Sequence, residues 1–350
     1  MRFNQFLTSY YPDPDYGGKR HFDDLIAQAV LADRLGFDAV SLPEHHLINI
    51  LMMPSPLQMA VKLTGLTDNI ELVTAVAVLP LRDMRIFAGE VAQADMLCDG
   101  RLVLGVGRGA FGYEMARLGT PIEISREKFD ESLDVLWALL DREEVSWSGK
   151  YYRFEPLTVM PRPTRPVPMM LAAVRPEAIY HSAKRGFHIQ TSALQASLES
   201  MLGQTAAFRA AKAELGEDGK HMRLAMQRVT YAARDEADAK DKLTRAYEYY
   251  ARFDNVFTGP GEVSRGHIAA LPRQQTLEQL GRNLLICPPA EMVDRLCIYR
   301  EAGIDELILS SGMGQPQGET LEAMQRFAEE VMPHFAAPER PQCAKAEVLA

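Results

Sequence analysis

Short apolar runs alternate along the chain with longer stretches in which apolar residues recur at helical spacing. A short apolar run is typical of a buried strand, whereas apolar residues at intervals of three and four indicate an amphipathic helix. We expect strands at 2–7, 38–42, 70–79, 101–106, 167–173, 187–190, 222–232 and 306–310. We expect helices at 21–35, 56–66, 84–97, 125–140, 176–185, 194–215, 236–253, 289–302 and 321–335.

The order of these elements predicts the fold. Strand–helix alternation repeated about eight times is typical of a (β/α)8 TIM barrel. A doubly wound sheet is the alternative, but no linker or break in composition divides the chain into halves. We therefore predict an α/β protein with a single barrel domain at 1–335. Two insertions interrupt the repeat, a hairpin near 145–154 and an irregular stretch near 258–274, and a tail at 336–350 is loosely ordered or packs on a partner subunit.

Composition narrows the class of partner and the compartment. A net charge of −9 argues against nucleic acid or an anionic membrane as partner. The longest apolar stretch, 72–81, is too short to span a bilayer, and the N-terminal residues become polar too soon for a signal peptide. The four cysteines lie far apart without CxxC spacing, so neither a disulfide framework nor a zinc site is indicated. We expect a soluble, cytoplasmic protein.

The loop after the second predicted strand carries three titratable side chains. The sequence SLPEHHLIN at 41–49 contains Glu44, His45 and His46. Because neighbouring side chains diverge and no second His or Asp cluster has ligand spacing, we expect no metal site. A neutral imidazole at a strand end suits hydrogen bonding to a reacting group or proton transfer. We expect one histidine to face the barrel mouth and the other to pack sideways, with Glu44 orienting either one or forming a surface ion pair.

Two further loops offer positive charge on the same face. In GVGRGAFG, 105–112, alternate glycines would bring the backbone close to a ligand and Arg108 would supply a forked cation. The motif only approximates a dinucleotide fingerprint, because Ala110 replaces the last glycine and no clear helix begins there. In LAAVRPEA, 171–178, Pro176 suits the first turn of a helix whose free N–H groups, with Arg175, would face an anion. For both arginines a solvated side chain is the alternative interpretation.

Apolar residues follow the histidines and the arginine loop, namely Ile48, Ile50, Leu51, Met52, Met53, Phe111 and Tyr113. Such residues suit a pocket for an aromatic cofactor or a hydrophobic substrate, although most residues of this kind belong to cores.

Taken together, four segments resemble the bacterial luciferase-like flavin monooxygenase family: LGFDAVSLPEHH, TAVAVLP, DGRLVLGVGRG and PVPMMLAA. The resemblance covers about residues 1–335. It implies a (β/α)8 barrel that binds FMN at the C-terminal face, receives it as FMNH2 from a separate flavin reductase, and forms a C4a-peroxyflavin with O2. It also implies a homodimer.

Carried over to this chain, the resemblance implies a role for individual residues. His45 matches the catalytic histidine. Ala75 and Val76 match the dipeptide beneath the flavin ring, which in luciferase is joined by a non-prolyl cis peptide. Arg108, with Gly109, matches the phosphate-binding position, and Val174 and Arg175 fall where luciferase has a Glu–Ser pair at the phosphate helix.

The resemblance also implies a mobile lid at 258–274, with Arg265 and His267 as closing contacts. Met52, Phe111 and Tyr113 are the residues expected on the substrate or lid side of the pocket.

The chain departs from luciferase at the flavin site. Gly107 replaces the reactive cysteine, Phe111 replaces the following tyrosine, and the Glu–Ser pair is lost. These changes favour a monooxygenase that acts with FMNH2 and O2 on a hydrophobic small molecule over a light-emitting enzyme. Two alternatives stay open: a deazaflavin- or NAD(P)H-linked reductase on the same barrel, and a non-catalytic flavin-binding subunit.

Overall fold

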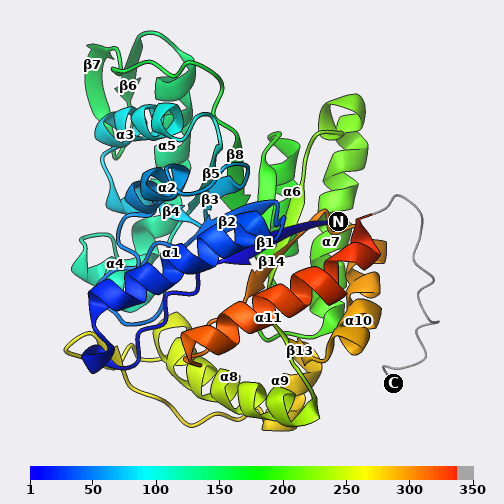
Figure 1. Cartoon of the computed structure of the whole chain (residues 1–350). Helices are drawn as coiled ribbons and strands as arrows, with labels where there is room; N and C mark the ends of the chain where they lie inside the picture. Colours follow the sequence, from blue (N-terminus) through cyan, green and yellow to red (C-terminus); the bar gives the residue numbers. More distant parts are fainter. Residues whose placement is uncertain (337–350) are drawn as a thin grey trace.

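The computed structural model describes residues 1–336, in which strands and helices alternate along the chain (Figure 1). The strands are β1 (Arg2–Phe6), β2 (Ala39–Leu42), β3 (Glu71–Thr74), β4 (Ala77–Val78), β5 (Leu102–Gly107), β6 (Val145–Ser148), β7 (Arg153–Leu157), β8 (Met169–Ala172), β9 (His188–Ser192), β10 (Leu224–Ala232), β11 (Val263–Ser264), β12 (His267–Ile268), β13 (Leu285–Cys287) and β14 (Glu306–Ser310).

The α-helices are α1 (Gly18–Arg34), α2 (Pro56–Thr64), α3 (Met84–Leu97), α4 (Gly112–Arg117), α5 (Ile122–Asp141), α6 (Pro176–Lys184), α7 (Leu198–Leu215), α8 (Glu236–Phe257), α9 (Leu277–Asn283), α10 (Pro289–Ala302) and α11 (Gln317–Glu330). Single 3-10 turns lie at Pro14–Tyr16, Leu79–Leu81, Gly216–Gly219 and Met332–Phe335.

Parallel strands of the described residues close into a barrel in the order β1, β2, β3, β5, β8, β9, β10 and β14, with β14 pairing back to β1. The short β4 follows β3 and pairs with β5. Closure pairs each of these eight strands on both sides, which is how barrels avoid edge-to-edge association. The predicted TIM barrel is confirmed, and the doubly wound sheet is excluded because β9 pairs with β10.

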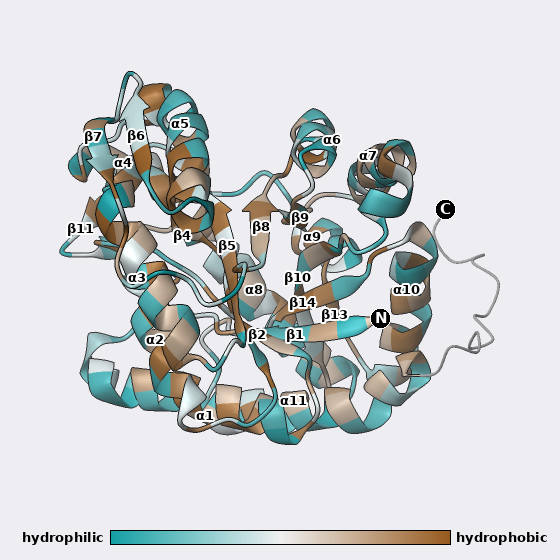
Figure 2. Cartoon of the chain, turned by 90° about the horizontal axis from the view of Figure 1, so that it is seen from above, coloured by the Kyte–Doolittle hydropathy of each residue, from teal (hydrophilic) through white to brown (hydrophobic). Residues whose placement is uncertain are grey.

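Helices cover the outside of this barrel. Viewed from above, α1, α2, α3, α5, α6, α7, α10 and α11 surround the strands (Figure 2). All six positions of β5 and all four of β2 are buried, because one face of each strand packs against helices and the other fills the barrel. Burial on both faces explains why these strands appear in the sequence as continuous apolar runs rather than as alternating patterns.

Three element predictions differ from the structure. The single strand expected at 70–79 is two short strands, β3 and β4, separated by Ala75 and Val76. A six-residue helix, α4, begins at Gly112, so the prediction that no helix follows the arginine loop is wrong. The helix α9 and strand β13 between 277 and 287 were not predicted, because their composition is mixed and each is short.

The two insertions lie outside the barrel wall. Strands β6 and β7 form an antiparallel hairpin that lies beyond α3 and α5, at the upper left of Figure 1. The stretch 258–274 contains the two-residue strands β11 and β12, which pair antiparallel. The tail predicted at 336–350 lies, except for Ala336, outside the described residues. Within 1–336, no helix combines the length and the apolar character needed to cross a bilayer.

Candidate active site

A cavity of about 170 Å³ lies at the carboxyl ends of the barrel strands. Phe6, Ala75, Ser192 and Ser310, which are at or directly after the ends of four strands, line it. Its other lining residues are His45, Leu51, Ala110, Phe111, Leu194, Gln227, Arg228, Val229, Tyr249, Tyr250, Phe253 and Phe257. Barrel enzymes place their active sites at this face, so the cavity is the candidate active site.

His45 lines the cavity and is held by a buried carboxylate. Its Nδ1 lies 2.6 Å from Oε1 of Glu114, and its ring stacks on Phe111 with the centroids 4.2 Å apart. The other oxygen of Glu114 accepts the backbone N–H of His46 at 2.8 Å. Because a carboxylate only accepts hydrogen bonds, Nδ1 carries the proton and Nε2 of a neutral His45 is left as an acceptor.

His46 and Glu44 form a separate network. Nε2 of His46 lies 2.8 Å from one oxygen of Glu44. The second Glu44 oxygen accepts from the backbone N–H of Val78 at 3.0 Å and from Arg82 at 2.7 Å. Glu44 is buried, so the alternative of a surface ion pair is wrong, and it orients His46 rather than His45. The prediction that one histidine faces the barrel mouth while the other packs sideways is confirmed.

The peptide bond between Ala75 and Val76 is cis, as the resemblance implies, and Ala75 lines the cavity. Glycines in β5 make room for this segment. A Cβ at Gly105 would lie 1.9 Å from the carbonyl oxygen of Thr74, and one at Gly107 would lie 2.5 Å from a methyl carbon of Val76. The two glycines therefore admit the neighbouring strand, which gives them a packing role.

Three arginines gather near the carboxyl ends of β5 and β8. Burial lowers the pKa of Arg108, and the nearby charges of Arg126 and Arg175 lower it further. Among the described residues, no side-chain hydrogen bond or ion pair involves Arg108 or Arg175, whereas Arg126 has a distant partner, Asp130, at 3.9 Å. Arg175 is the N-cap of α6, with Pro176 at its first position. A cluster of positive charges without close counter-ions favours the binding of an anion, and so does a helix N-terminus. Arg126 was not predicted as part of this site.

The expected lid contacts the loop that carries the histidines. Asn49 donates from Nδ2 to Nδ1 of His267 and accepts the backbone N–H of Ile268, both at 3.2 Å. Tyr113 packs beside the lid at Gly261, where an added Cβ would lie 3.4 Å from the Tyr113 Cβ. His267 is thus a contact between the lid and the barrel.

Several predicted site residues do not reach the cavity. Arg265 is exposed at the turn between β11 and β12, and Val174 is exposed before α6. Met52 is engaged through its backbone with Ser9, and its neighbour Leu51 lines the cavity instead. Gly109, at a φ of +83°, packs against side chains of the protein and is absent from the lining.

The residues that sequence reasoning missed come from elements distant in sequence. Glu114 lies in the unpredicted helix α4, and Arg228 lies within β10. Tyr249 and Tyr250 belong to α8, where the aromatic run YEYYARF at 247–253 was a usable signal. Within 1–336, no group of three or more His, Cys, Asp or Glu side chains is placed to hold a metal ion.

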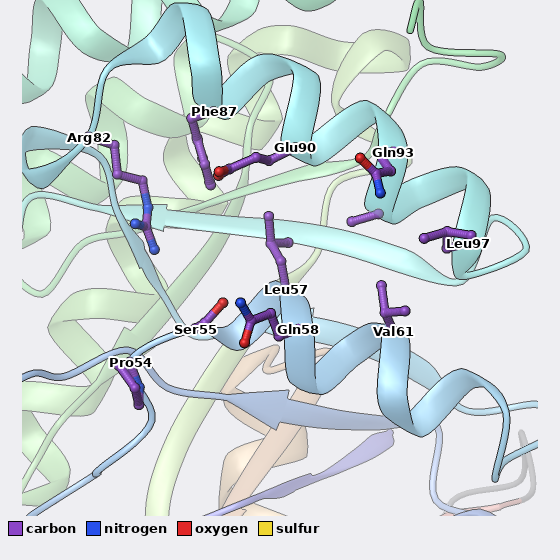
Figure 3. Close-up of a pocket in the computed structure, with 11 residues that line it drawn as sticks. Pro54, Ser55, Leu57, Gln58, Val61, Arg82, Phe87, Glu90, Gln93 and Leu97 are labelled. Carbon is purple, nitrogen blue, oxygen red and sulfur yellow. The ribbon is translucent and has the colours of Figure 1, made fainter.

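A second cavity, of about 430 Å³, lies outside the barrel between α2 and α3 (Figure 3). Side chains of α3, including Phe87 and Glu90, face Leu57 and Gln58 of α2 across it. Its arginine, Arg82, is already paired with Glu44, and the lining contains no histidine or cysteine. We therefore assign the chemistry to the cavity at the barrel mouth.

Comparisons with known proteins agree with this site. The sequence pattern of the luciferase-like monooxygenase family matches residues 1–306. The chain is 26% identical over 347 residues, covering 96% of both chains, to the oxygenase component of a flavin-dependent trigonelline monooxygenase of Acinetobacter baylyi. It is 31% identical over 339 residues, covering 91% of this chain and 94% of the relative, to an F420-dependent glucose-6-phosphate dehydrogenase of Beutenbergia cavernae.

A solved structure shares the fold. It is the FMN complex of the oxygenating constituent of 3,6-diketocamphane monooxygenase, a type II Baeyer–Villiger enzyme from Pseudomonas putida. The TM-score is 0.77 at 18% identity, covering 97% of this chain and all of the other. With the family pattern matched from the first strand to the last barrel strand, and relatives aligned along nearly their whole length, this chain belongs to the luciferase-like monooxygenase family.

Proposed function

We propose that this protein is a flavin-dependent monooxygenase that uses FMNH2 and O2 to oxygenate a hydrophobic small molecule. One observation carries the proposal: a buried carboxylate fixes His45 in a cavity that also contains the cis peptide at Ala75, near Arg108 and Arg175, which form no ion pair with a described residue. Such an arrangement combines an acid–base group, a peptide segment on which a flavin ring could lie, and an anion-binding site.

The residues present fit a flavin mononucleotide. Arg108, Arg126 and Arg175, with the N-terminus of α6, would hold its phosphate. Ala75 and Val76 would support its ring, and Gly107 leaves the space that Val76 fills. Bound FMNH2 would supply the electrons that activate O2.

The protein's own groups would control protons and water. His45, with Nδ1 fixed by Glu114, would hold or transfer a proton at Nε2. The aromatic side chains of Phe111, Phe253 and Phe257 pack against one another over the cavity. They would keep water away from the reacting atoms, which strengthens electrostatic interactions and limits side reactions.

Names of relatives support this proposal without deciding it. A relative is named as the oxygenase component of a flavin-dependent monooxygenase, so we propose that a separate reductase supplies FMNH2 here as well. A homodimer is a further part of the proposal, and light scattering tests it. A deazaflavin-linked dehydrogenase is the second candidate, because an F420-dependent relative is 31% identical to this chain.

Oxygen uptake tests the proposal. The protein is mixed with chemically reduced FMN or with reduced F420, and oxygen consumption, hydrogen peroxide and products are measured across a panel of aldehydes, ketones, aromatics and sulfur compounds. We expect oxygenated product with FMNH2 and none with reduced F420. We also expect His45→Ala to lower product yield with little change in FMN affinity. Substrate reduction by reduced F420 without oxygen consumption would overturn the proposal, and flavin binding without any turnover would favour the non-catalytic subunit.

A further inference from the structure

Arg228 brings an uncompensated positive charge to the wall of the active-site cavity. It lies within β10, is 2% exposed and lines the cavity. Its guanidinium donates to the hydroxyl of Tyr299 at 2.8 Å, to the carbonyl of Leu194 at 3.0 Å and to that of Ala196 at 3.3 Å. These partners are neutral, and Arg228 forms no ion pair with any carboxylate of residues 1–336. One N–H of Nη2 is left without a partner there. A buried charge of this kind is costly unless an anion compensates it.

Two phenols lie in the same part of the cavity. Tyr249 and Tyr250 of α8 are 6% and 4% exposed and both line the cavity. Neither hydroxyl forms a hydrogen bond with another described residue, so both are free to bind a ligand in the cavity. Burial raises the pKa of both phenols, so each stays a hydrogen-bond donor at neutral pH. The charge of Arg228 acts on Tyr250, which places the arginine and this phenol close together.

The carboxylate whose charge also acts on Tyr250, that of Asp254, does not neutralise Arg228. Asp254 accepts from Gln195 at 2.9 Å and lies 3.6 Å from Arg273, its own cationic partner. Arg273 is also buried and stands over the ring of Tyr250 with its Cζ 5.3 Å from the centroid. Arg228, Arg273 and Asp254 together leave an excess of one positive charge beside Tyr250.

Position in the barrel indicates which ligand meets this charge. In the closed order of strands, β10 lies four places from β3 in either direction, so Arg228 and Ala75 come from opposite walls. The proposed phosphate site lies after β5 and β8, also away from β10. A flavin held at Ala75 and the arginine cluster therefore leaves the β10 wall to the substrate. The rest of the lining there is apolar, including Val229 and Phe253.

We propose that Arg228, Tyr249 and Tyr250 bind a carboxylate of the substrate, so that the oxygenated molecule has an apolar or aromatic body and one anionic group. This inference rests on the proposed function, since it assigns the flavin to the opposite wall. It sharpens the substrate class from hydrophobic molecules in general to hydrophobic carboxylates.

Calorimetric titration of the FMN-saturated protein with benzoate and with benzamide tests the inference. The two probes share a ring and differ in charge, and saturating FMN occupies the phosphate site. We expect benzoate to bind about tenfold or more tightly than benzamide, as a hydrogen bond to a charged group would give. Cyclohexanecarboxylate and its amide repeat the comparison for a non-aromatic body.

Variants locate the carboxylate. Arg228→Gln should abolish the preference for benzoate, and Tyr250→Phe should weaken benzoate binding about tenfold. Tyr231→Phe is the matched control, because Tyr231 is buried on the same strand but is absent from the cavity lining. If Arg228→Gln fails to fold, the affinities of the wild-type protein for benzoate and benzamide, and the benzoate affinity of Tyr250→Phe, still test the inference.

Two results would overturn the inference. The first is equal affinity for the carboxylates and their amides, and the second is a preference that survives both substitutions. If the first result is found and Arg228→Gln also lowers the FMN midpoint potential, the charge of Arg228 serves the reduced flavin instead. Because the titration needs no turnover, a failure of oxygenation itself leaves these outcomes distinguishable. If FMN does not bind, the same probes are titrated in saturating inorganic phosphate, which then occupies the phosphate site in place of FMN.

Discussion

Replacing Glu114 with glutamine tests how His45 is positioned. The side chains are nearly isosteric, but an amide presents one acceptor and one donor where the carboxylate presents two acceptors. Glu114 accepts from Nδ1 of His45 at 2.6 Å and from the backbone of His46 at 2.8 Å. With glutamine, either the contact to His46 is lost or the amide N–H faces Nδ1, which forces the proton of His45 onto Nε2.

The expected size of the effect follows from these two contacts. A hydrogen bond to a charged group contributes about 1.5–3 kcal/mol, and the alternative tautomer presents a donor where an acceptor is needed. A loss of about 2–4 kcal/mol of transition-state stabilisation corresponds to a fall of about 30- to 1,000-fold in kcat. FMN affinity should change little, because Glu114 does not touch the arginine cluster.

The assay separates positioning from folding. Product formation is measured at saturating FMNH2 and O2, together with KM for the substrate, FMN binding and thermal unfolding. Glu123→Gln is the matched control, since Glu123 is an exposed carboxylate on α5. We expect kcat to fall while KM and FMN affinity stay near wild type. A variant with wild-type kcat, or one that loses kcat and FMN affinity together, would refute the positioning role.

Three further predictions follow. Arg108→Ala should weaken FMN binding about 10- to 100-fold by flavin fluorescence titration, and an unchanged Kd would remove Arg108 from the phosphate site. Gly105→Ala should destabilise the protein by about 3 kcal/mol or more in denaturant unfolding, because its Cβ would lie 1.9 Å from the Thr74 carbonyl oxygen. Gly65→Ala is the control and should be near neutral, because an added Cβ there has nothing within 4 Å. Equal stability of the two variants would contradict this packing. Burial lowers the pKa of His188 to about 4. As the pH falls from about 6.5, the unfolded state therefore takes up this proton before the folded state does. The free energy of unfolding should drop by about 2 kcal/mol between pH 6.5 and 4, a value reduced because the side chain is partly exposed. His188→Gln should flatten that part of the stability profile, and a wild-type slope in the variant would assign it to other groups.

The sequence was most informative where local pattern decides structure. Helices such as α3 and α10 and the strand β14 lie at their predicted bounds, because amphipathic spacing, Asp99–Gly100 after α3 and Pro289 at the start of α10 are local signals. The break at Ala75–Val76 has no comparable local signal. The related feature in the sequence is the presence of glycine at positions 105 and 107, where a side chain would clash with Thr74 and Val76, and this requirement is visible only in the folded structure.

The site was only partly predictable for a related reason. His45 and Arg108 stand in distinctive loops directly after strands, so their place at the barrel mouth follows from the fold. Arg228 and Tyr250 line the cavity from a buried strand and a long amphipathic helix, and Glu114 holds His45 there from a six-residue helix. In each case the side chain fits the periodicity of an ordinary core residue, and only the closed barrel shows what it faces.

If the proposed function holds, O2 is incorporated into a substrate while FMNH2 is oxidised, and labelled oxygen follows this incorporation. The protein is mixed with FMNH2 and a panel of substrates that carry a carboxylate, under ¹⁸O2, and the masses of the products are measured by mass spectrometry. We expect product carrying one atom of ¹⁸O, with its yield strongly reduced in His45→Ala, as the proposed function requires. Unlabelled product formed without oxygen consumption, with reduced F420 as the hydride donor, would contradict it.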